Sequence, residues 1–408
     1  MSPSTDFIPF SKPDIGPAEE AAALRVLRSG WLTTAGEARA FEAEFAEAVG
    51  KAHALAVSSA TAGLHLALEA VGVGPGDLVA MSPYTFAATA EVVRYLGAHP
   101  LFVDIEEDGF NIDPERLEAA IAAAQADFDG GAERKAPGPP AGPVRAVVPV
   151  HVAGRPCDMA RIGEIAARAG AAVVSDAAHT LLTADGTPVG ADGDAAAFSF
   201  YATKPITTGE GGMVVTDRAD LAERMRVMRL HGIDRDVWDR YTSQQAGWAY
   251  AVTEAGFKYN MPDLAAAIGR VQLEKAGEMQ ARRREIAARY RAGLGDLEWL
   301  TLPSDHPLHC YHLFILQLDL DRLSIDRDGL ISELREAGIG TSVHFIPLHV
   351  MPYYRRLYGY TEDSFPVSWS RFARAVSLPI YSGLTDEQVD RVIHAMRAVG
   401  ERHSRIAP

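Results

Sequence analysis

The feature that most constrains the fold is a regular alternation of short apolar runs and helical patterns between residues 53 and 178. Each apolar run leads into a segment whose apolar residues recur at the spacing of a helix. Repeats of this kind place their strands parallel in one sheet, with helices on both faces. We therefore predict a mostly parallel sheet whose strands include residues 53–59, 78–83, 99–105, 144–152 and 171–178.

The C-terminal part has a different pattern, which indicates a second, smaller unit. Residues 262–292 form one long helical pattern with few breaks, and Gly293 is a plausible stop. Beyond it we predict two strands at residues 311–320 and 340–348, and two helices at residues 327–337 and 385–399. A chain of 408 residues also exceeds what one hydrophobic core usually supports. We expect an N-terminal arm, a large domain, a linking helix and a small C-terminal domain at residues 1–17, 18–261, 262–292 and 293–408.

One segment interrupts the alternation of strands and helices. Residues 127–143 are rich in Gly and Pro, which is typical of a surface loop. The alternation resumes unchanged after this segment, so we do not interpret it as a domain boundary. Its sequence indicates no function.

Charge and composition argue against several classes of protein. Lys and Arg total 39 against 54 Asp and Glu, a net charge of −15, which argues against binding by phosphate-backbone neutralisation. Hydrophobic residues at 48% and charged residues at 23% are typical of a globular chain rather than a disordered one. Cys157 and Cys310 are the only cysteines, which fits a reducing environment. Because the sequence presents no secretory leader, long apolar run or lipidation signal, we expect a cytoplasmic protein.

Two stretches carry the candidate chemistry, AAVVSDAAHT at 171–180 and AAAFSFYATKPITTGEGGMVVT at 195–216. The first delivers Asp176 at the C-terminal end of a strand, where α/β folds place their ligands. Lys204 follows 28 residues later (204 − 176 = 28), five residues after Ser199. A lysine that forms a Schiff base and an aspartate that keeps a pyridine nitrogen protonated are what pyridoxal phosphate (PLP) chemistry needs. Taken singly, Asp176 could equally be a helix-capping residue and Lys204 a surface lysine.

The motifs around this pair resemble those of a known family. DAAHT, FSFYATK and TTGEGGMVVT are similar to the signature of the DegT/DnrJ/EryC1/StrS family of PLP-dependent sugar aminotransferases. Further matches, in order, extend from about Pro9 to Leu384 and include residues 58–68, 82–93, 256–275 and 341–349. The resemblance implies an α/β, aspartate-aminotransferase-like architecture (PLP fold type I). In this architecture a mostly parallel sheet of seven strands forms the large domain, and a smaller α/β domain follows it.

The resemblance also implies roles for the residues around the cofactor ring. Lys204 matches the Schiff-base lysine, and Asp176 matches the partner of the pyridinium nitrogen. Ala178 is small enough for the flat ring to lie against it, and His179 matches a residue near the ring hydroxyl. The alternative for His179 is a core or turn histidine. Phe86 matches the aromatic residue that stacks on the ring, and its alternative is a core phenylalanine.

A second group of residues matches the phosphate site of the family. Ala60 and Thr61 lie at a strand-to-helix junction, where free amides and the helix dipole favour an anion. Ser199 adds a hydroxyl donor, and Asn260 matches a residue that reaches the phosphate of the neighbouring subunit. Thr61 could also be a plain helix cap, a role compatible with phosphate binding. Asn260 could instead cap the helix that begins near Pro262.

The remaining matches concern the substrate. Thr33, Tyr84 and His344 match positions that border it, and residues 231–241 resemble members that aminate C4 of UDP-linked keto sugars. The resemblance therefore implies ping-pong transfer of an amino group, with glutamate as the expected donor, onto a nucleotide-linked keto sugar. Amination at C3 and sugar dehydration are the alternatives. Family dehydratases carry His where this chain has Lys204, which favours transamination. A non-catalytic regulator is the alternative from another class, and the intact Lys204 and Asp176 argue against it.

The expected partners follow from the same resemblance. If Asn260 reaches a neighbouring phosphate, the protein is a homodimer with shared active sites. Four aromatic residues could border the substrate or pack in an interface: Trp238, Tyr241, Trp248 and Tyr250. We expect no nucleic acid, membrane or metal partner. His344 and His349 would point to opposite faces of one strand, which does not suit a metal site.

Overall fold

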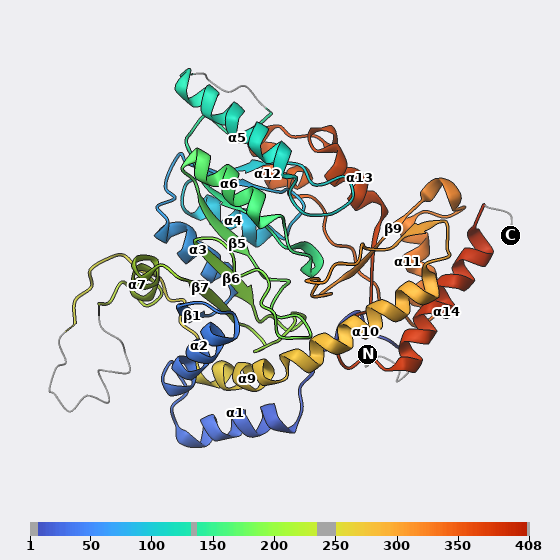
Figure 1. Cartoon of the computed structure of the whole chain (residues 1–408), viewed down its shortest axis with the longest axis horizontal. Helices are drawn as coiled ribbons and strands as arrows, with labels where there is room; N and C mark the ends of the chain where they lie inside the picture. The colour runs from blue at the N-terminus through green and yellow to red at the C-terminus, as the bar shows by residue number, and fades with distance from the viewer. Residues whose placement is uncertain (1–6, 132–136, 235–249, 406–408) are drawn as a thin grey trace.

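The computed structural model describes residues 7–131, 137–234 and 250–405. Its larger sheet has seven strands in the order β1-β7-β6-β5-β4-β2-β3 (Figure 1). Neighbouring strands from β6 to β3 are parallel, whereas β7 is antiparallel to both of its neighbours. The mostly parallel sheet predicted from the alternation is confirmed. Its strands are β1 (His53–Val57), β2 (Leu78–Met81), β3 (His99–Phe102), β4 (Val144–Val148), β5 (Ala172–Asp176), β6 (Ala195–Ser199) and β7 (Gly212–Thr216).

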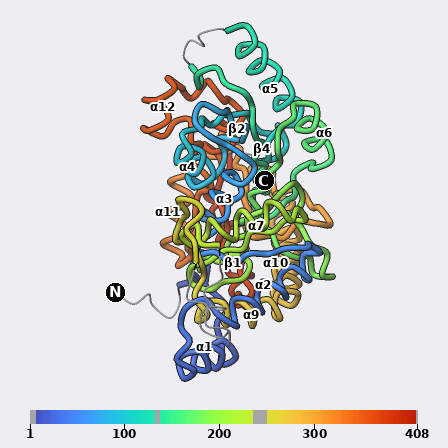
Figure 2. The backbone as a smooth tube through the Cα atoms, turned by 90° about the vertical axis from the view of Figure 1, so that its left-hand side faces the viewer, coloured from blue at the N-terminus to red at the C-terminus, as the bar shows by residue number. Residues whose placement is uncertain are grey.

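Helices cover both faces of this sheet, which explains why most residues of its strands are apolar and buried. In β2 every residue is buried, and successive side chains enter different cores: Val79 and Met81 one, Leu78 and Ala80 another. One end of the molecule carries α1, α2 and α9, and the opposite end carries α5 (Figures 1 and 2). The helices of this part are α1 (Pro17–Ser29), α2 (Gly36–Ala48), α3 (Ala60–Ala70), α4 (Ala87–Tyr95), α5 (Pro114–Asp129), α6 (Met159–Ala169) and α7 (Ala219–Met228).

The predicted long helix is two helices, α9 (Asp263–Glu274) and α10 (Ala276–Leu294), which meet at Lys275. The Lys275 amine bonds Asp14 of the N-terminal arm at 3.0 Å and Glu19 of α1 at 2.9 Å. The junction is therefore tied to the N-terminal arm and to α1. Beyond α10 lie β8 (Leu300–Thr301), β9 (Phe314–Leu318), α11 (Arg327–Glu336), α12 (Pro352–Tyr358), α13 (Pro366–Arg374), β10 (Ala375–Leu378) and α14 (Asp386–His403).

The strand predicted at residues 340–348 is wrong. The second sheet has the order β10-β9-β8, so β10 takes the place beside β9. Within the described residues, the 340–348 segment makes one isolated bridge, from Ser342 to Ser377, before a short 3₁₀ helix at Leu348–Val350. The Leu348 amide instead donates to the Pro83 carbonyl at 2.8 Å, which draws the segment toward the larger sheet.

Among the helices of the described residues, we find none that combines the length and apolar character of a membrane span.

Candidate active site

The carboxyl ends of β5 and β6 bring the two key side chains to one edge of the larger sheet. Asp176 ends β5 and pairs with Ala197 of the parallel strand β6. Lys204 follows β6 in a turn where its amide donates to the Tyr201 carbonyl at 2.9 Å. The Lys204 and Asp176 charges each act on the pKa of the other, so the fold places the predicted pair together. Within the described part of the chain, the Lys204 amine has no hydrogen bond and no ion pair within 4.0 Å.

Burial sets the acid–base properties of both groups. Loss of water lowers the pKa of Lys204 to about 8, although the Asp176 charge opposes the shift. Burial raises the pKa of Asp176, and the Thr89 hydroxyl, the Ala178 amide and the Lys204 charge oppose that shift. A sizeable fraction of Lys204 is consequently neutral near pH 8, the form in which an amine acts as a nucleophile or proton acceptor.

The sequence analysis did not identify Thr89, which bonds Asp176 directly. The Thr89 hydroxyl donates to Asp176 Oδ2 at 2.8 Å, and the Ala178 amide donates to Asp176 Oδ1 at 3.2 Å. Thr89 lies in the first turn of α4, three residues after Phe86. Because residues three apart share a helix face, the TFAAT sequence contained a signal for this contact.

His179 is buried next to Lys204 and is neutral. Its Nδ1 accepts a hydrogen bond from the Ala153 amide at 3.2 Å, which leaves the ring proton on Nε2. The ring stacks on Phe345 with centroids 5.7 Å apart and lies 4.4 Å from the ring of His312. Burial and the nearby Lys204 charge hold the pKa of His179 well below its ordinary value. Phe345 and His312 are further neighbours that the sequence analysis missed.

Tyr84 does not face an open substrate site. Its side chain is fully buried, its ring centroid is 5.2 Å from that of Phe110, and its hydroxyl donates to the His344 carbonyl. With its hydroxyl satisfied inside the protein, Tyr84 fits a role in positioning the His344 segment. The His344 Nδ1 lies 2.9 Å from the Ser377 hydroxyl, and burial and the Lys204 charge lower the pKa of His344 to about 4. Thr33 is exposed.

Gly212 brings the predicted phosphate residues to one place. It pairs with Ser199 of β6 on one side and with Val57 of β1, just before α3, on the other. A Cβ atom at Gly212 would lie 2.6 Å from the Ala60 nitrogen and 2.8 Å from the Phe198 carbonyl oxygen. The missing side chain therefore allows the amino end of α3, with Ala60 and Thr61, to approach Ser199. Free amides at a helix start together with hydroxyl groups suit a phosphate.

Asn260 lies at the same edge within its own chain. It forms an antiparallel bridge with Val57, and its side-chain amide donates to the Thr34 hydroxyl at 2.6 Å. The Lys258 amine also donates to the Asn260 side-chain oxygen. Contact between Asn260 and a phosphate of a second subunit stays a prediction.

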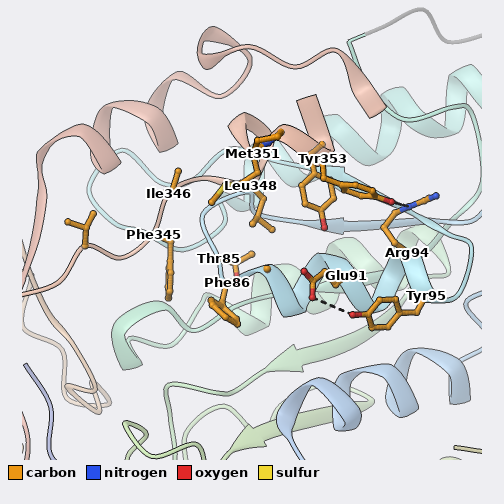
Figure 3. A pocket seen from close by; sticks show the side chains of 14 residues that line it. Thr85, Phe86, Glu91, Arg94, Tyr95, Phe345, Ile346, Leu348, Met351 and Tyr353 are labelled. Atoms are coloured by element: carbon orange, nitrogen blue, oxygen red, sulfur yellow. Dashed lines mark hydrogen bonds between the residues drawn. The ribbon is translucent and has the colours of Figure 1, made fainter. Parts of the chain in front are cut away.

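The Phe86 ring lies at one end of a cavity of about 740 Å³. Phe86 precedes α4 and is 66% exposed, with its ring centroid 6.5 Å from that of Phe345. Figure 3 shows these two rings at one end of the cavity, while Arg94 and Tyr95 lie at the other. Lys204 and Asp176 do not line this cavity, so it borders the candidate site rather than containing it.

These side chains fit PLP. Lys204 offers a partly neutral amine that makes no hydrogen bond to the residues the structure describes, and Asp176 offers a buried carboxylate. Phe86 offers an exposed aromatic face, and the α3 start with Ser199 offers anion donors. Of the predicted aromatic residues, Trp238, Tyr241 and Trp248 lie outside the described residues, and Tyr250 is exposed.

Comparison with known proteins agrees with this chemistry. The DegT/DnrJ/EryC1/StrS aminotransferase family matches residues 13–397. The spore coat polysaccharide biosynthesis protein SpsC of Bacillus subtilis (strain 168) is 44% identical over 397 residues, which cover 96% of this chain and 97% of SpsC.

Solved structures of similar proteins agree with the fold. Spr1654 of Streptococcus pneumoniae, a proposed sugar aminotransferase, has been solved in PLP and PMP forms. The PLP form has a TM-score of 0.84 and 29% identity, covering 97% of this chain and 99% of that one. Helicobacter pylori PseC, an aminotransferase involved in the biosynthesis of pseudoaminic acid, has a TM-score of 0.84 and 26% identity, covering 98% and 100%.

Proposed function

We propose, from the premise that the chain belongs to the DegT/DnrJ/EryC1/StrS aminotransferase family, that it aminates the C4 keto carbon of a UDP-linked sugar with glutamate as donor. The protein is a PLP-dependent sugar aminotransferase. The observation that carries the proposal is the Lys204–Asp176 pair at the carboxyl ends of β5 and β6, where each charge acts on the other.

Each residue of the pair has a distinct task in the proposed reaction. When bound, PLP supplies an aldehyde that accepts an amine and a ring that withdraws electrons from it. Lys204 holds the cofactor through its side-chain nitrogen and, when released, carries a proton at that same atom. Asp176 places a negative charge opposite the ring nitrogen. The Ala60 amide and the Thr61 and Ser199 hydroxyls bind the phosphate, and Phe86 covers one face of the ring.

The substrate class is supported by two relatives and by the cavity beside Phe86. SpsC takes its name from polysaccharide biosynthesis, and PseC acts in the biosynthesis of pseudoaminic acid. A nucleotide-linked keto sugar that serves as a glycan precursor fits both. A cavity of about 740 Å³ next to Phe86 is also within the size range of small-molecule sites.

We also propose that the enzyme is a cytoplasmic homodimer whose active sites are shared. Leu24 and Leu27 of α1 are exposed apolar groups that a second chain could cover. Both cysteines are buried and unpaired, which fits a reducing compartment. Within each subunit, we propose that residues 262–292 link a large domain that ends at residue 261 to a small domain that begins at residue 293.

A substrate panel tests the proposed specificity. The loaded enzyme is incubated with glutamate and with UDP-, TDP- or GDP-linked 4-keto and 3-keto sugars, and each product is analysed by mass and by position of the new amine. We expect the UDP-4-keto sugar to gain an amine at C4 at the highest rate. Amination at C3, or loss of water without gain of nitrogen, would replace the proposal with one of its alternatives.

A further inference from the structure

We propose that Thr89, supported by Thr85, is a positioning residue that holds Asp176 ionised and in one orientation. The inference rests on the function proposed above, in which Asp176 faces the cofactor ring nitrogen. Thr85 Oγ1 lies 2.8 Å from Thr89 Oγ1, and Thr89 Oγ1 lies 2.8 Å from Asp176 Oδ2. The three side chains form a continuous hydrogen-bonded chain that is buried throughout.

The ionised carboxylate fixes the direction of this chain. A carboxylate only accepts hydrogen bonds, so Thr89 must donate its single hydroxyl proton to Asp176. The Thr89 oxygen is then free to accept, and Thr85 must be the donor in the second bond. If Asp176 were protonated, it could donate a hydrogen bond to Thr89, and Thr85 would no longer have to be the donor in the second bond. A hydrogen bond donated to a carboxylate stabilises its charged form, and the Thr89 bond accordingly lowers the pKa of Asp176.

The position of Thr89 in α4 indicates that its hydroxyl has a specific use. Threonine is β-branched and forms helices less well than alanine, and α4 contains three alanines. A threonine inside a helix commonly bonds a backbone carbonyl of the preceding turn. Thr89 instead bonds a side chain 87 positions away. Because Thr89 lies in the first turn, the carboxylate also lies near the positive end of the α4 dipole.

The electrostatic surroundings of Asp176 explain why this support matters. Burial raises the pKa of Asp176, and within the described residues the Thr89 hydroxyl, the Ala178 amide and the Lys204 charge oppose that shift. Lys204 joins its nitrogen to the cofactor when PLP binds, so its own charge is not a constant support. The Asp176 charge also acts on Cys157, but that thiol donates to the Val150 carbonyl, and burial raises its pKa and keeps it neutral. The Thr89 hydroxyl and the Ala178 amide are neutral donors, so they stabilise the negative charge of Asp176 whether or not PLP is bound.

The experiment compares cofactor binding by matched variants of the full-length apoprotein. Thr89→Val removes the hydroxyl and keeps the shape, Thr89→Ser keeps the hydroxyl, and Thr85→Val breaks the outer bond. PLP is titrated into each apoprotein across a range of pH, and the dissociation constant is measured from the change in absorbance. Asp176→Asn is the reference for complete loss of the charge, and circular dichroism with a melting curve confirms that each variant is folded.

We expect Thr89→Val to weaken PLP binding by about ten- to a hundredfold, the size expected for a hydrogen bond to a charged group. The pH at which binding falls on acidification should move upward, because Asp176 then takes up a proton more readily. Thr89→Ser should stay within about threefold of the wild type, and Thr85→Val should weaken binding by about threefold. If Thr89→Val does not fold, Thr85→Val provides the test instead. The pH at which its PLP binding falls on acidification should then be higher than in the wild type.

The outcomes separate this inference from the proposed function. Equal binding by Thr89→Val and wild type, alongside a large loss in Asp176→Asn, would overturn only the inference. A Thr89→Ser variant as impaired as Thr89→Val would also overturn it, since shape and not the hydroxyl would then matter. Wild-type binding by Asp176→Asn would instead overturn the role proposed for Asp176 itself.

Discussion

At the scale of single residues, the account depends on how burial changes Lys204. An exposed lysine is almost fully protonated near neutral pH, whereas burial lowers the pKa of Lys204 to about 8. The amine of this residue can therefore attack an aldehyde in the pH range where an ordinary lysine reacts slowly. Among the described residues this amine makes no hydrogen bond, which fits a residue whose partner is the cofactor rather than another side chain.

The first prediction concerns the pH dependence of cofactor capture by the apoprotein. Only the neutral amine attacks, so the rate should rise about tenfold per pH unit below the pKa of Lys204 and level off above about 8. Stopped-flow absorbance after mixing with PLP measures this rate. A rate that kept rising toward pH 10 would show that Lys204 titrates like an exposed lysine.

The second prediction concerns removal of the amine. Lys204→Ala should lower kcat by at least about a thousandfold, because both the attachment of the cofactor and the proton transfer are lost. The measurement is product formation with glutamate and the keto sugar. Lys51→Ala is the matched control, since Lys51 pairs with Asp217 at the opposite end of β7 from Gly212, and it should retain a much larger share of activity.

The sequence identified the chemistry of the site better than its supporting contacts. Asp176 and Lys204 follow strands whose ends must meet in a parallel sheet, so their proximity could be predicted. The spacing of Phe86 and Thr89 places both near the start of α4, but the bond from Thr89 to Asp176 also depends on how α4 packs against β5, a contact between residues 87 positions apart. Tyr84 was expected to border the substrate, but its hydroxyl is satisfied by the His344 carbonyl, a contact between residues 260 positions apart.

At the scale of structural elements, the site depends on how closely α3 approaches β6 and β7. The start of α3 touches the position where a Gly212 side chain would lie, and β7 separates β1 from β6. The antiparallel direction of β7 brings its first residue, Gly212, to the edge where β1 and β6 end. The close approach of α3 to β6 and β7 therefore requires a glycine at position 212.

The third prediction follows from that contact. Gly212→Ala should lower the free energy of unfolding by about 1–3 kcal/mol and weaken PLP binding, because α3 must move away from Ser199. Urea denaturation and cofactor titration measure the two effects. Gly163→Ala in α6 is the control, since its Cβ meets nothing within 4 Å, and it should stabilise the helix by about 0.5–1 kcal/mol. Equal stability of the two variants would contradict this view of Gly212.

Elements whose structure follows from the local sequence pattern were predicted correctly. Elements whose structure depends on tertiary contacts were not. Five of the seven strands of the larger sheet were predicted within a few residues from their apolar runs, whereas β6 and β7 were not predicted as strands. The apolar segment at 340–348 resembles a strand equally well, but β10 occupies the place beside β9. The break between α9 and α10 at Lys275 likewise reflects contacts with Asp14 and Glu19, far away in the sequence.

At the scale of the whole molecule, the open question is whether one chain completes an active site. The exposed side chains of Leu24 and Leu27 on α1 suit burial against a second copy. In this structure the Asn260 side chain bonds Thr34 and Lys258 of its own chain. A shared site requires Asn260 to serve the phosphate of the partner.

The fourth prediction uses mixed dimers to test this sharing. Asn260→Ala alone should weaken PLP binding by about tenfold. Refolded mixtures of Asn260→Ala and Lys204→Ala chains should regain tight binding at one site, where a chain with Lys204 receives Asn260 from its partner. Activity and bound PLP per dimer report the result. Mixtures no better than the separate variants would place Asn260 in the site of its own chain.

The most direct test of the central claim is to locate the covalent link to the cofactor. The wild-type enzyme loaded with PLP is reduced with borohydride and digested, and its peptides are analysed by mass spectrometry. We predict a single modified peptide with the added mass on Lys204, and loss of that modification when Asp176→Asn weakens cofactor binding. Modification of a different lysine, or none at all, would contradict the account.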